Sequence, residues 1–320
     1  MSQPQTSTTP ETSQIRTLLD ELETLLLGKR RKLEYAVTCL LAEGHLLIED
    51  VPGVGKTTLA KSLAGGVKAS FKRVQFTSDL LPSDLIGVTV FHQARSEFEF
   101  KKGPIFTNVL LADEINRANP KTQSALLEAM HDAQISHDGE THQLPQPFFV
   151  VATQNSKDNH GTFSLPESQL DRFLMKIHLG YPAPAYEKRV LKGDYRVTMG
   201  ARARLSLADL QSLQAMSREV HVSDEVLDFI YRVVKASREH AGVLVGVSPR
   251  GGMALYRACQ ALALVRGRDF VIPDDVRELT PFVCAHRVLL NHSQIMTTVN
   301  PDESALQIFR EIIMNLNAPS

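Results

Sequence analysis

A glycine-rich segment near residue 55 contains the residue types that bind nucleotide phosphates. It matches the phosphate-loop pattern G-x-x-x-x-G-K-[ST], except that an aspartate stands at the first glycine position. Glycines let backbone N–H groups approach phosphate oxygens, and the N-terminus of a following helix adds favourable partial charge. Lys56 is expected to reach the β- and γ-phosphates of ATP, and Thr57 to offer a hydroxyl to Mg²⁺. The alternative is a glycine-rich turn that only caps a helix. The residues expected to bind the nucleotide are Asp50, Gly53, Val54, Gly55, Lys56, Thr57 and Thr58.

Polar side chains also follow two apolar segments further along the chain. Asp113 and Glu114 come directly after the first, and ligands of open α/β sheets bind at the carboxyl ends of the strands. Asp113 is expected to hold Mg²⁺ through its water shell, and Glu114 to polarise the attacking water, which implies hydrolysis. In isolation such a pair is often only the start of a loop. Asn155 follows the second segment and is expected to orient the water, although asparagine is also a frequent turn residue.

Two arginines stand where they could stabilise charge on a phosphate. Arg172 precedes another apolar segment, where it would act as an arginine finger on a neighbour's nucleotide or pair with Asp171 or Glu167. Arg250 lies in the first turn of a helix that a Ser-Pro pair begins. There it would fold onto ATP as part of a lid, or it would be an ordinary exposed arginine.

Five short apolar segments are predicted to be the strands that position these residues. They are apolar on both faces and alternate with helical patterns, which favours a doubly wound parallel sheet covered by helices. The strands are expected at His45–Asp50, Arg73–Thr77, Asn108–Asp113, Phe148–Thr153 and Leu174–Leu179. The helices are expected at Ile15–Leu27, Arg30–Ala42, Lys56–Leu63 and Thr122–Ala133.

The pattern changes after residue 181, where helical segments follow without a convincing strand cluster. We predict a disordered tail over residues 1–14, an α/β nucleotide-binding core over 15–181 and an all-helical lid over 182–320. The lid helices are expected at Ala185–Tyr195, Leu207–Arg218, Ser223–His240, Pro249–Val265 and Pro273–Leu289.

Composition narrows the class of protein. The chain has 35 basic and 36 acidic residues, and the formal charge of -1 argues against binding nucleic acid mainly through bulk positive charge. Its apolar segments are shorter than the roughly 20 residues that span a bilayer, so no direct membrane insertion is expected. The three cysteines are far apart, which favours buried reduced thiols and a cytoplasmic location.

Taken together, these residues resemble the AAA+ ATPases, and among them the MoxR family. The family's loop often has the sequence that residues 49–53 have here, which accounts for Asp50. The resemblance assigns Asn155 to sensor 1, Arg172 to the arginine finger and Arg250 to sensor 2. Ser156 stands where the family usually has proline. The similarity runs from about Gly28 to Val288, and its most specific stretches are residues 76–87, 103–106, 112–118 and 121–130.

Two segments are predicted to form β-hairpins, and they look like the family's inserts. One covers residues 88–102, and the other covers 134–144 around an Asp-Gly turn. In a ring, such hairpins would project toward a central pore. Three phenylalanines of the first hairpin would either touch a substrate or only pack within the hairpin: Phe91, Phe98 and Phe100. Three histidines along loops are expected to be solvated or capping rather than metal ligands: His137, His142 and His160.

The resemblance implies an ATP-driven ring, a hexamer, that remodels or matures a protein client. Metal-cofactor insertion is among the family's associations, and a protein with a von Willebrand factor A domain is the expected partner. In such a ring the expected site takes Arg172 from the neighbour and its other residues from one subunit: Lys56, Thr57, Asp113, Glu114, Asn155 and Arg250. Two alternatives remain. A DNA-directed AAA+ motor is disfavoured by the balanced charge, and a non-hydrolysing scaffold by the presence of Glu114 and Asn155.

Overall fold

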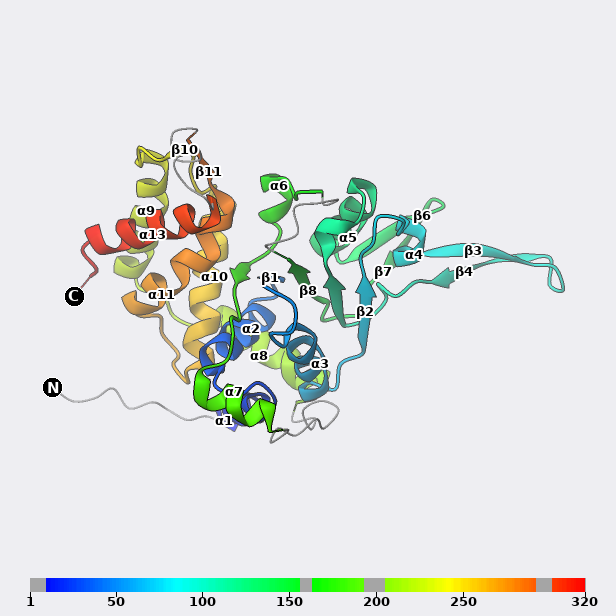
Figure 1. The fold of residues 1–320 in the computed structure, drawn as a ribbon, viewed down its shortest axis with the longest axis horizontal. Coiled ribbons are helices and arrows are strands. Elements are labelled where there is room, and N and C mark those ends of the chain that lie inside the picture. The colour runs from blue at the N-terminus through cyan, green and yellow to red at the C-terminus, as the bar shows by residue number, and fades with distance from the viewer. Residues whose placement is uncertain (1–9, 156–162, 193–204, 292–300, 320) are drawn as a thin grey trace.

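The computed structural model describes residues 10–155, 163–192, 205–291 and 301–319 (Figure 1). Helix α1 (Pro10–Leu25) begins five residues before the expected start, so residues 10–14 of the predicted disordered tail are helical. Proline suits the first turn of a helix because its φ angle is already helical and its missing N–H has no partner there. The rest of the predicted tail lies outside the described residues.

A five-stranded parallel sheet forms the centre of the molecule, as predicted. Its strand order is β2-β5-β8-β1-β9, and all neighbouring strands are parallel. The strands are β1 (Leu46–Glu49), β2 (Phe71–Gln75), β5 (Val109–Asp113), β8 (Phe149–Gln154) and β9 (Met175–Ile177).

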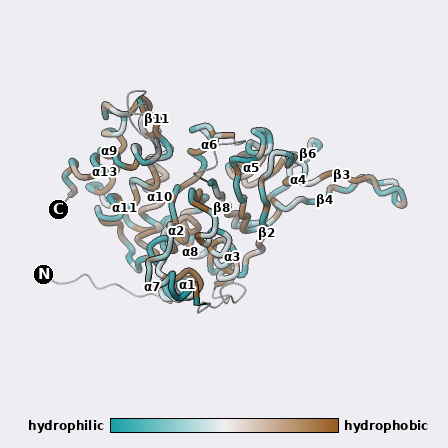
Figure 2. The backbone as a smooth tube through the Cα atoms, in the orientation of Figure 1, coloured by the Kyte–Doolittle hydropathy of each residue, from teal (hydrophilic) through white to brown (hydrophobic). Residues whose placement is uncertain are grey.

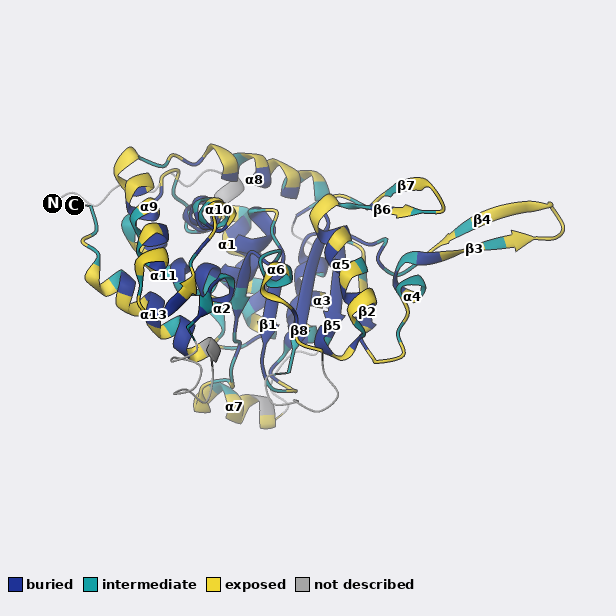
Figure 3. Cartoon of the chain, turned by 90° about the horizontal axis from the view of Figure 1, so that it is seen from above, coloured by how far each residue is buried: buried dark blue, intermediate teal, exposed yellow. Residues whose placement is uncertain are grey.

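Alternate side chains of each strand enter different hydrophobic cores. Leu46 and Ile48 pack with α1, α2 and α3, whereas Leu47 packs on the other face with α4 and α5. Burying each such side chain contributes about 1.5–3 kcal/mol, which explains why the central strands are apolar throughout. Figure 3 shows these strands buried between the helices. The helices on the two faces are α2 (Arg30–Leu41), α3 (Lys56–Gly66), α4 (Pro82–Ile86) and α5 (Pro120–Asp132).

Two antiparallel hairpins extend from the core, also as predicted. The longer ribbon pairs β3 (Gly87–His92) with β4 (Glu97–Lys102), and the shorter pairs β6 (Gln134–His137) with β7 (Glu140–Gln143). The longer one projects well beyond the body of the molecule, and Figure 2 shows mixed hydropathy along it. The sequence therefore predicted both hairpins, and the structure adds their strand pairing.

The described part of the region after residue 181 is mainly helical. A short antiparallel pair, β10 (Val243–Val245) with β11 (Leu289–Leu290), corrects the expectation that no strands follow the core. The C-terminal helix α13 was not expected. The helices are α7 (Pro184–Leu191), α8 (Leu207–Glu219), α9 (Asp224–Glu239), α10 (Pro249–Val265), α11 (Pro273–Cys284) and α13 (Pro301–Asn315). No helix in the described part of the chain is both long and apolar enough to cross a membrane.

The lid helices share a hydrophobic core with the N-terminal helices. Helix α10 packs along α2 and α8, and the buried side chains of all three belong to one cluster. Glu278 of α11 adds a polar link, because its Oε1 accepts hydrogen bonds from Arg31, Tyr35 and Arg266. The lid is therefore packed against the α2 side of the sheet.

Candidate nucleotide-binding site

The phosphate loop lies between the end of β1 and the start of α3. Gly53 and Gly55 have φ angles of 87° and 100°, a region that residues with a Cβ rarely adopt. No side chain caps α3 at Gly55. Lys56 is buried, and its Nζ donates to the carbonyl of Asp50 over 2.8 Å. The loop therefore offers first-turn N–H groups and an ammonium group, which together suit an anion.

The carboxylate of Asp50 bonds both to the next residue of the loop and to the linker that leads into the lid. Its two oxygens accept from the backbone N–H groups of Val51 (2.9 Å) and Gly180 (2.6 Å). Lys29 donates to three successive carbonyls of the same linker, those of residues 179–181, and burial lowers its pKa while Asp50 raises it. Asp50 thus connects the phosphate loop to the start of the lid, and only its carbonyl contacts Lys56.

The two acidic residues predicted for this site lie at the carboxyl end of β5. Asp113 accepts from the Thr153 hydroxyl at Oδ1 (2.5 Å) and from Arg73 Nη2 at Oδ2 (2.6 Å). Glu114 has a φ of 58°, and its Oε2 accepts from Gln75 Nε2 over 2.9 Å. Sequence reasoning missed Arg73, Gln75 and Thr153. The feature that could have revealed them is the register of the sheet, which places Gln75 on β2 directly opposite Asp113 on β5.

Asn155 directly follows β8, which lies between β5 and β1. Because all three strands are parallel, their carboxyl ends meet at one edge of the sheet. The structure therefore brings the phosphate loop, the acid pair and Asn155 to the same edge.

A cavity of about 250 Å³ adjoins the phosphate loop on the side of α1. Leucines and Pro182 form most of its apolar lining, which suits the flat ring of a nucleotide base. Its lining residues are Leu25, Leu26, Leu27, Lys29, Gly53, Val54, Gly55, Thr58 and Pro182.

The two predicted arginines lie together at the opposite edge of the sheet. Arg172 Nη1 donates to the carbonyl of Leu127 over 2.5 Å, and Arg250 Nε lies 3.9 Å from Asp171 Oδ2. Both line a cavity of about 310 Å³ that also contains His45, at the amino end of β1. Arg250 was expected beside its own subunit's nucleotide. It lies elsewhere because α10 packs against α2 instead of covering the phosphate loop.

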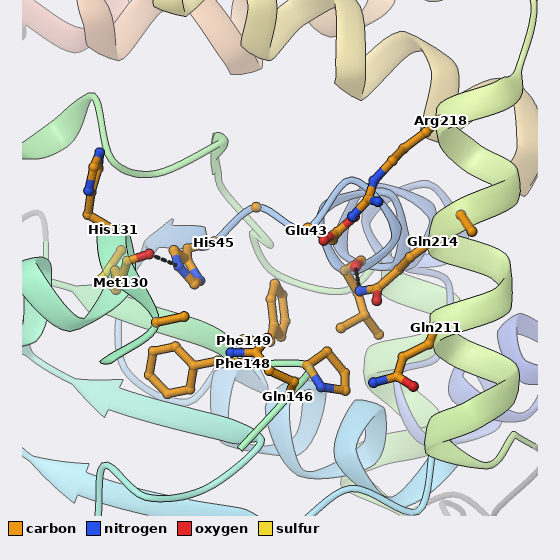
Figure 4. A pocket seen from close by; sticks show the side chains of 15 residues that line it. Glu43, His45, Met130, His131, Gln146, Phe148, Phe149, Gln211, Gln214 and Arg218 are labelled. Carbon is orange, nitrogen blue, oxygen red and sulfur yellow. Dashed lines mark hydrogen bonds and ion pairs between the residues drawn. The ribbon is translucent and has the colours of Figure 1, made fainter. Parts of the chain in front are cut away.

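A second cavity, of about 410 Å³, adjoins this arginine-lined cavity and shares His45 with it (Figure 4). The His45 ring bonds the Met130 carbonyl (3.0 Å) and accepts from the Val150 N–H (3.1 Å). Burial lowers the pKa of His45 to about 4, so the ring is neutral at physiological pH. Because this cavity lies at the amino edge of the sheet, it is remote from the phosphate loop.

The phenylalanines of the long hairpin divide into two groups. Phe100 stacks on His142, with ring centroids 4.4 Å apart, and also contacts His137. Phe91 and Phe98 contact each other near the tip and remain 50% and 75% exposed. Packing thus explains Phe100 but leaves the other two accessible. In the described residues no group of three His, Cys, Asp or Glu could hold a metal ion. Both His160 and Ser156 lie outside the described residues.

The strand order, the loop after β1, the acids after β5 and the helical lid define an AAA+ ATPase. Family models agree: residues 45–175 match the "ATPase family associated with various cellular activities (AAA)", and residues 235–307 match the "AAA lid domain". A crystal structure of a proposed ATPase from Cytophaga hutchinsonii superposes with a TM-score of 0.88 and 34% identity, covering 97% of this chain and 96% of that one.

Curated relatives narrow the class further. The chain is 44% identical to the uncharacterized protein YeaC of Bacillus subtilis, covering 94% of this chain and 93% of the relative. It is 42% identical to the chaperone MoxR1 of Mycobacterium tuberculosis (88% and 77%) and 30% identical to the protein MoxR of Methylorubrum extorquens (84% and 86%). The chain belongs to the MoxR family of AAA+ ATPases.

Proposed function

We propose that this protein hydrolyses ATP at a site that two neighbouring copies of the chain complete together. The observation that carries the proposal is the separation of the site residues between two edges of one sheet. The acids and the phosphate loop lie at the carboxyl edge, whereas Arg172 and Arg250 lie at the amino edge. Neither arginine can serve the nucleotide of its own subunit in this arrangement. Both would therefore act on a neighbour, which changes the expected role of Arg250.

In the proposed site the loop residues bind and orient the nucleotide. The N–H groups at the start of α3 and Lys56 Nζ would hold the phosphates once Lys56 leaves the carbonyl of Asp50. The Thr57 hydroxyl and the Asp113 carboxylate are hard oxygen donors, which fit Mg²⁺. A Mg²⁺ ion held by these two residues would supply positive charge that offsets the charge developing on the phosphates.

The remaining residues of the site would act on water and on transition-state charge. Glu114 would take a proton from the attacking water, and Asn155 would orient that water. In the structure the Glu114 carboxylate is held by Gln75 and lies 3.0 Å from Arg117 Nε. Both contacts are to Oε2, so the carboxylate could accept a proton from water at Oε1 while these partners hold it in place. Arginine fingers contribute roughly 10³–10⁵ in rate, so an isolated subunit should be slow.

Family membership supports a role in remodelling a protein client. The relative from Mycobacterium tuberculosis is named a chaperone. By resemblance we propose a hexameric ring with a core over residues 15–181 and a lid over 182–320. A partner with a von Willebrand factor A domain, metal-cofactor insertion and a cytoplasmic location belong to the same proposal. The exposed Phe91 and Phe98 at the hairpin tip are candidates for client contact.

ATP turnover measured against protein concentration tests this function. Specific activity should rise as subunits assemble, because each site needs a neighbour. Specific activity that stays constant from monomer to ring would refute the shared site. The same assay with DNA added tests the alternative motor, which should show DNA-stimulated, salt-dependent turnover.

A further inference from the structure

Arg287 is an almost fully buried arginine at the end of the 3-10 turn Ala285–Arg287, which follows α11, and it has no role in the proposed hydrolysis. Only 3% of its side chain is exposed. Its guanidinium donates to the carbonyls of Phe173 (2.5 Å) and Leu174 (3.1 Å), where β9 begins, and to that of Val283 at the end of α11. Arg287 thus joins the lid to the amino edge of the core sheet.

The same guanidinium holds Asp171, the residue before Arg172. Arg287 Nε lies 2.8 Å from Asp171 Oδ1, while Asp171 Oδ2 faces Arg250 at 3.9 Å. One carboxylate therefore contacts a buried cation on one side and a half-exposed cation on the other. Phe173, which follows Arg172, is fully buried, so both chain neighbours of Arg172 are fixed.

Gly251 provides independent support for this arrangement. A Cβ at this position would lie 2.6 Å from Val247 Cγ1 and 3.0 Å from Arg287 Cδ. The stem of Arg287 therefore passes directly against the first turn of α10, next to Arg250. A side chain at residue 251 would displace either that turn or Arg287.

We propose that Asp171, anchored by Arg287, is a positioning residue that holds Arg172 and Arg250 in one orientation toward the neighbour's nucleotide. The inference rests on the proposed function, in which both arginines act on the adjacent subunit. It adds that the two arginines work as one unit, because a single carboxylate and a single buried cation connect the core loop to the lid helix.

The test mixes subunits that are defective on opposite sides of the shared site. Asp171→Asn keeps an acceptor for Arg287 but removes the charge. Its turnover should fall by roughly 10-fold to 10³-fold, part of what an arginine finger contributes, with little change in KM for ATP. Glu114→Gln subunits lack the base but keep an intact arginine edge. Rings that contain both variants should therefore exceed the summed activity of the two parents.

Controls separate this inference from the proposed function. Arg172→Ala mixed with Glu114→Gln should recover activity in the same way, and its failure would refute the shared site itself. Suppose that the Arg172→Ala mixture recovers activity. The positioning role alone would then be overturned if Asp171→Asn had wild-type turnover, or if its mixture with Glu114→Gln did not recover activity. Asp228→Asn is the matched control, because Asp228 pairs with Arg232 (3.0 Å) on the remote helix α9, and it should behave as wild type.

A second variant covers the case in which Asp171→Asn does not fold. Arg287→Lys keeps a buried cation, but its single nitrogen has three N–H donors and cannot replace the five hydrogen bonds to oxygen atoms that the guanidinium makes from three nitrogens. It should assemble, lose turnover and recover in the mixture with Glu114→Gln. If thermal unfolding shows that neither variant folds, the pair is structural and the inference is wrong.

Discussion

The guanidinium of Arg73 on β2 lies against the carboxylate of Asp113 on β5, with Nη2 2.6 Å from Oδ2. Asp113 is the residue proposed to hold Mg²⁺, so a positive side chain already occupies one of its oxygens. Arg73 is half exposed, whereas Asp113 is buried. The pair therefore compensates the charge of a buried carboxylate, and it would compete with a metal ion bound there.

Removing Arg73 should make Mg²⁺ bind more easily. Because Arg73 is half exposed, solvent screens the pair, and we take the value of a screened ion pair, about 0.2–1 kcal/mol. Arg73→Gln should therefore lower the Mg²⁺ concentration for half-maximal ATP binding by up to about fivefold. A Mg²⁺ titration with a fluorescent ATP analogue measures this. Lys72→Gln removes an equal charge from the adjacent exposed position of β2. A higher Mg²⁺ requirement in Arg73→Gln would show that Arg73 orients Asp113 instead.

Lys56→Ala should abolish ATP binding. Lys56 is buried at the start of α3 and is the ammonium group expected to contact the β- and γ-phosphates. Calorimetric titration with ATP provides the measurement. Lys61→Ala, which changes an exposed lysine on the same helix, is the control and should bind normally. Retained affinity in Lys56→Ala would rule out the phosphate-loop role.

Glu114→Gln should bind ATP but hydrolyse it slowly. General-base catalysis typically contributes roughly 10²–10⁴ in rate, and glutamine cannot accept the proton. Single-turnover kinetics with bound ATP would measure the step directly. Unchanged turnover would remove Glu114 from the mechanism. The stable ATP-bound form would also serve to test whether a protein client binds.

Asp50→Ala should destabilise the linker between core and lid. The variant loses two charge-assisted hydrogen bonds, to the N–H groups of Val51 and Gly180. A hydrogen bond to a charged group contributes about 1.5–3 kcal/mol, and we expect a loss of that order in denaturant unfolding. Asp50→Asn keeps one acceptor oxygen and should lose less. An unchanged free energy of unfolding in Asp50→Ala would mean that the two hydrogen bonds contribute little.

Stability should fall as the solution is acidified below the ordinary histidine pKa. Burial lowers the pKa of His45 to about 4, so the folded state favours the neutral ring. That stabilisation is complete above about pH 6.5, the unfolded value, and is lost as pH falls toward 4. His45→Gln should reduce the difference in unfolding free energy between pH 7 and pH 5.

The patterns in single segments predicted the fold and the half of the site that lies at the carboxyl edge of the sheet. Apolar strands, the glycine loop and the acid pair are local features, so their elements and their common edge could be read from the sequence. The hydrogen-bond partners of Asp113 and Glu114 could not be read from it. Arg73, Gln75 and Thr153 reach Asp113 and Glu114 across strands, and only sheet register brings them there.

The sequence by itself determined the five strands, the phosphate loop with its acids at the carboxyl edge of the sheet, both hairpins and the family resemblance. Only the tertiary structure decided where Arg250 lies. Its helix start was correctly predicted, but a helix can pack on any surface that buries its apolar face. Here α10 buries that face against α2, which places Arg250 beside Asp171 and Arg172 instead of Lys56. Because that choice depends on the sum of many apolar contacts between distant segments, no local motif encodes it.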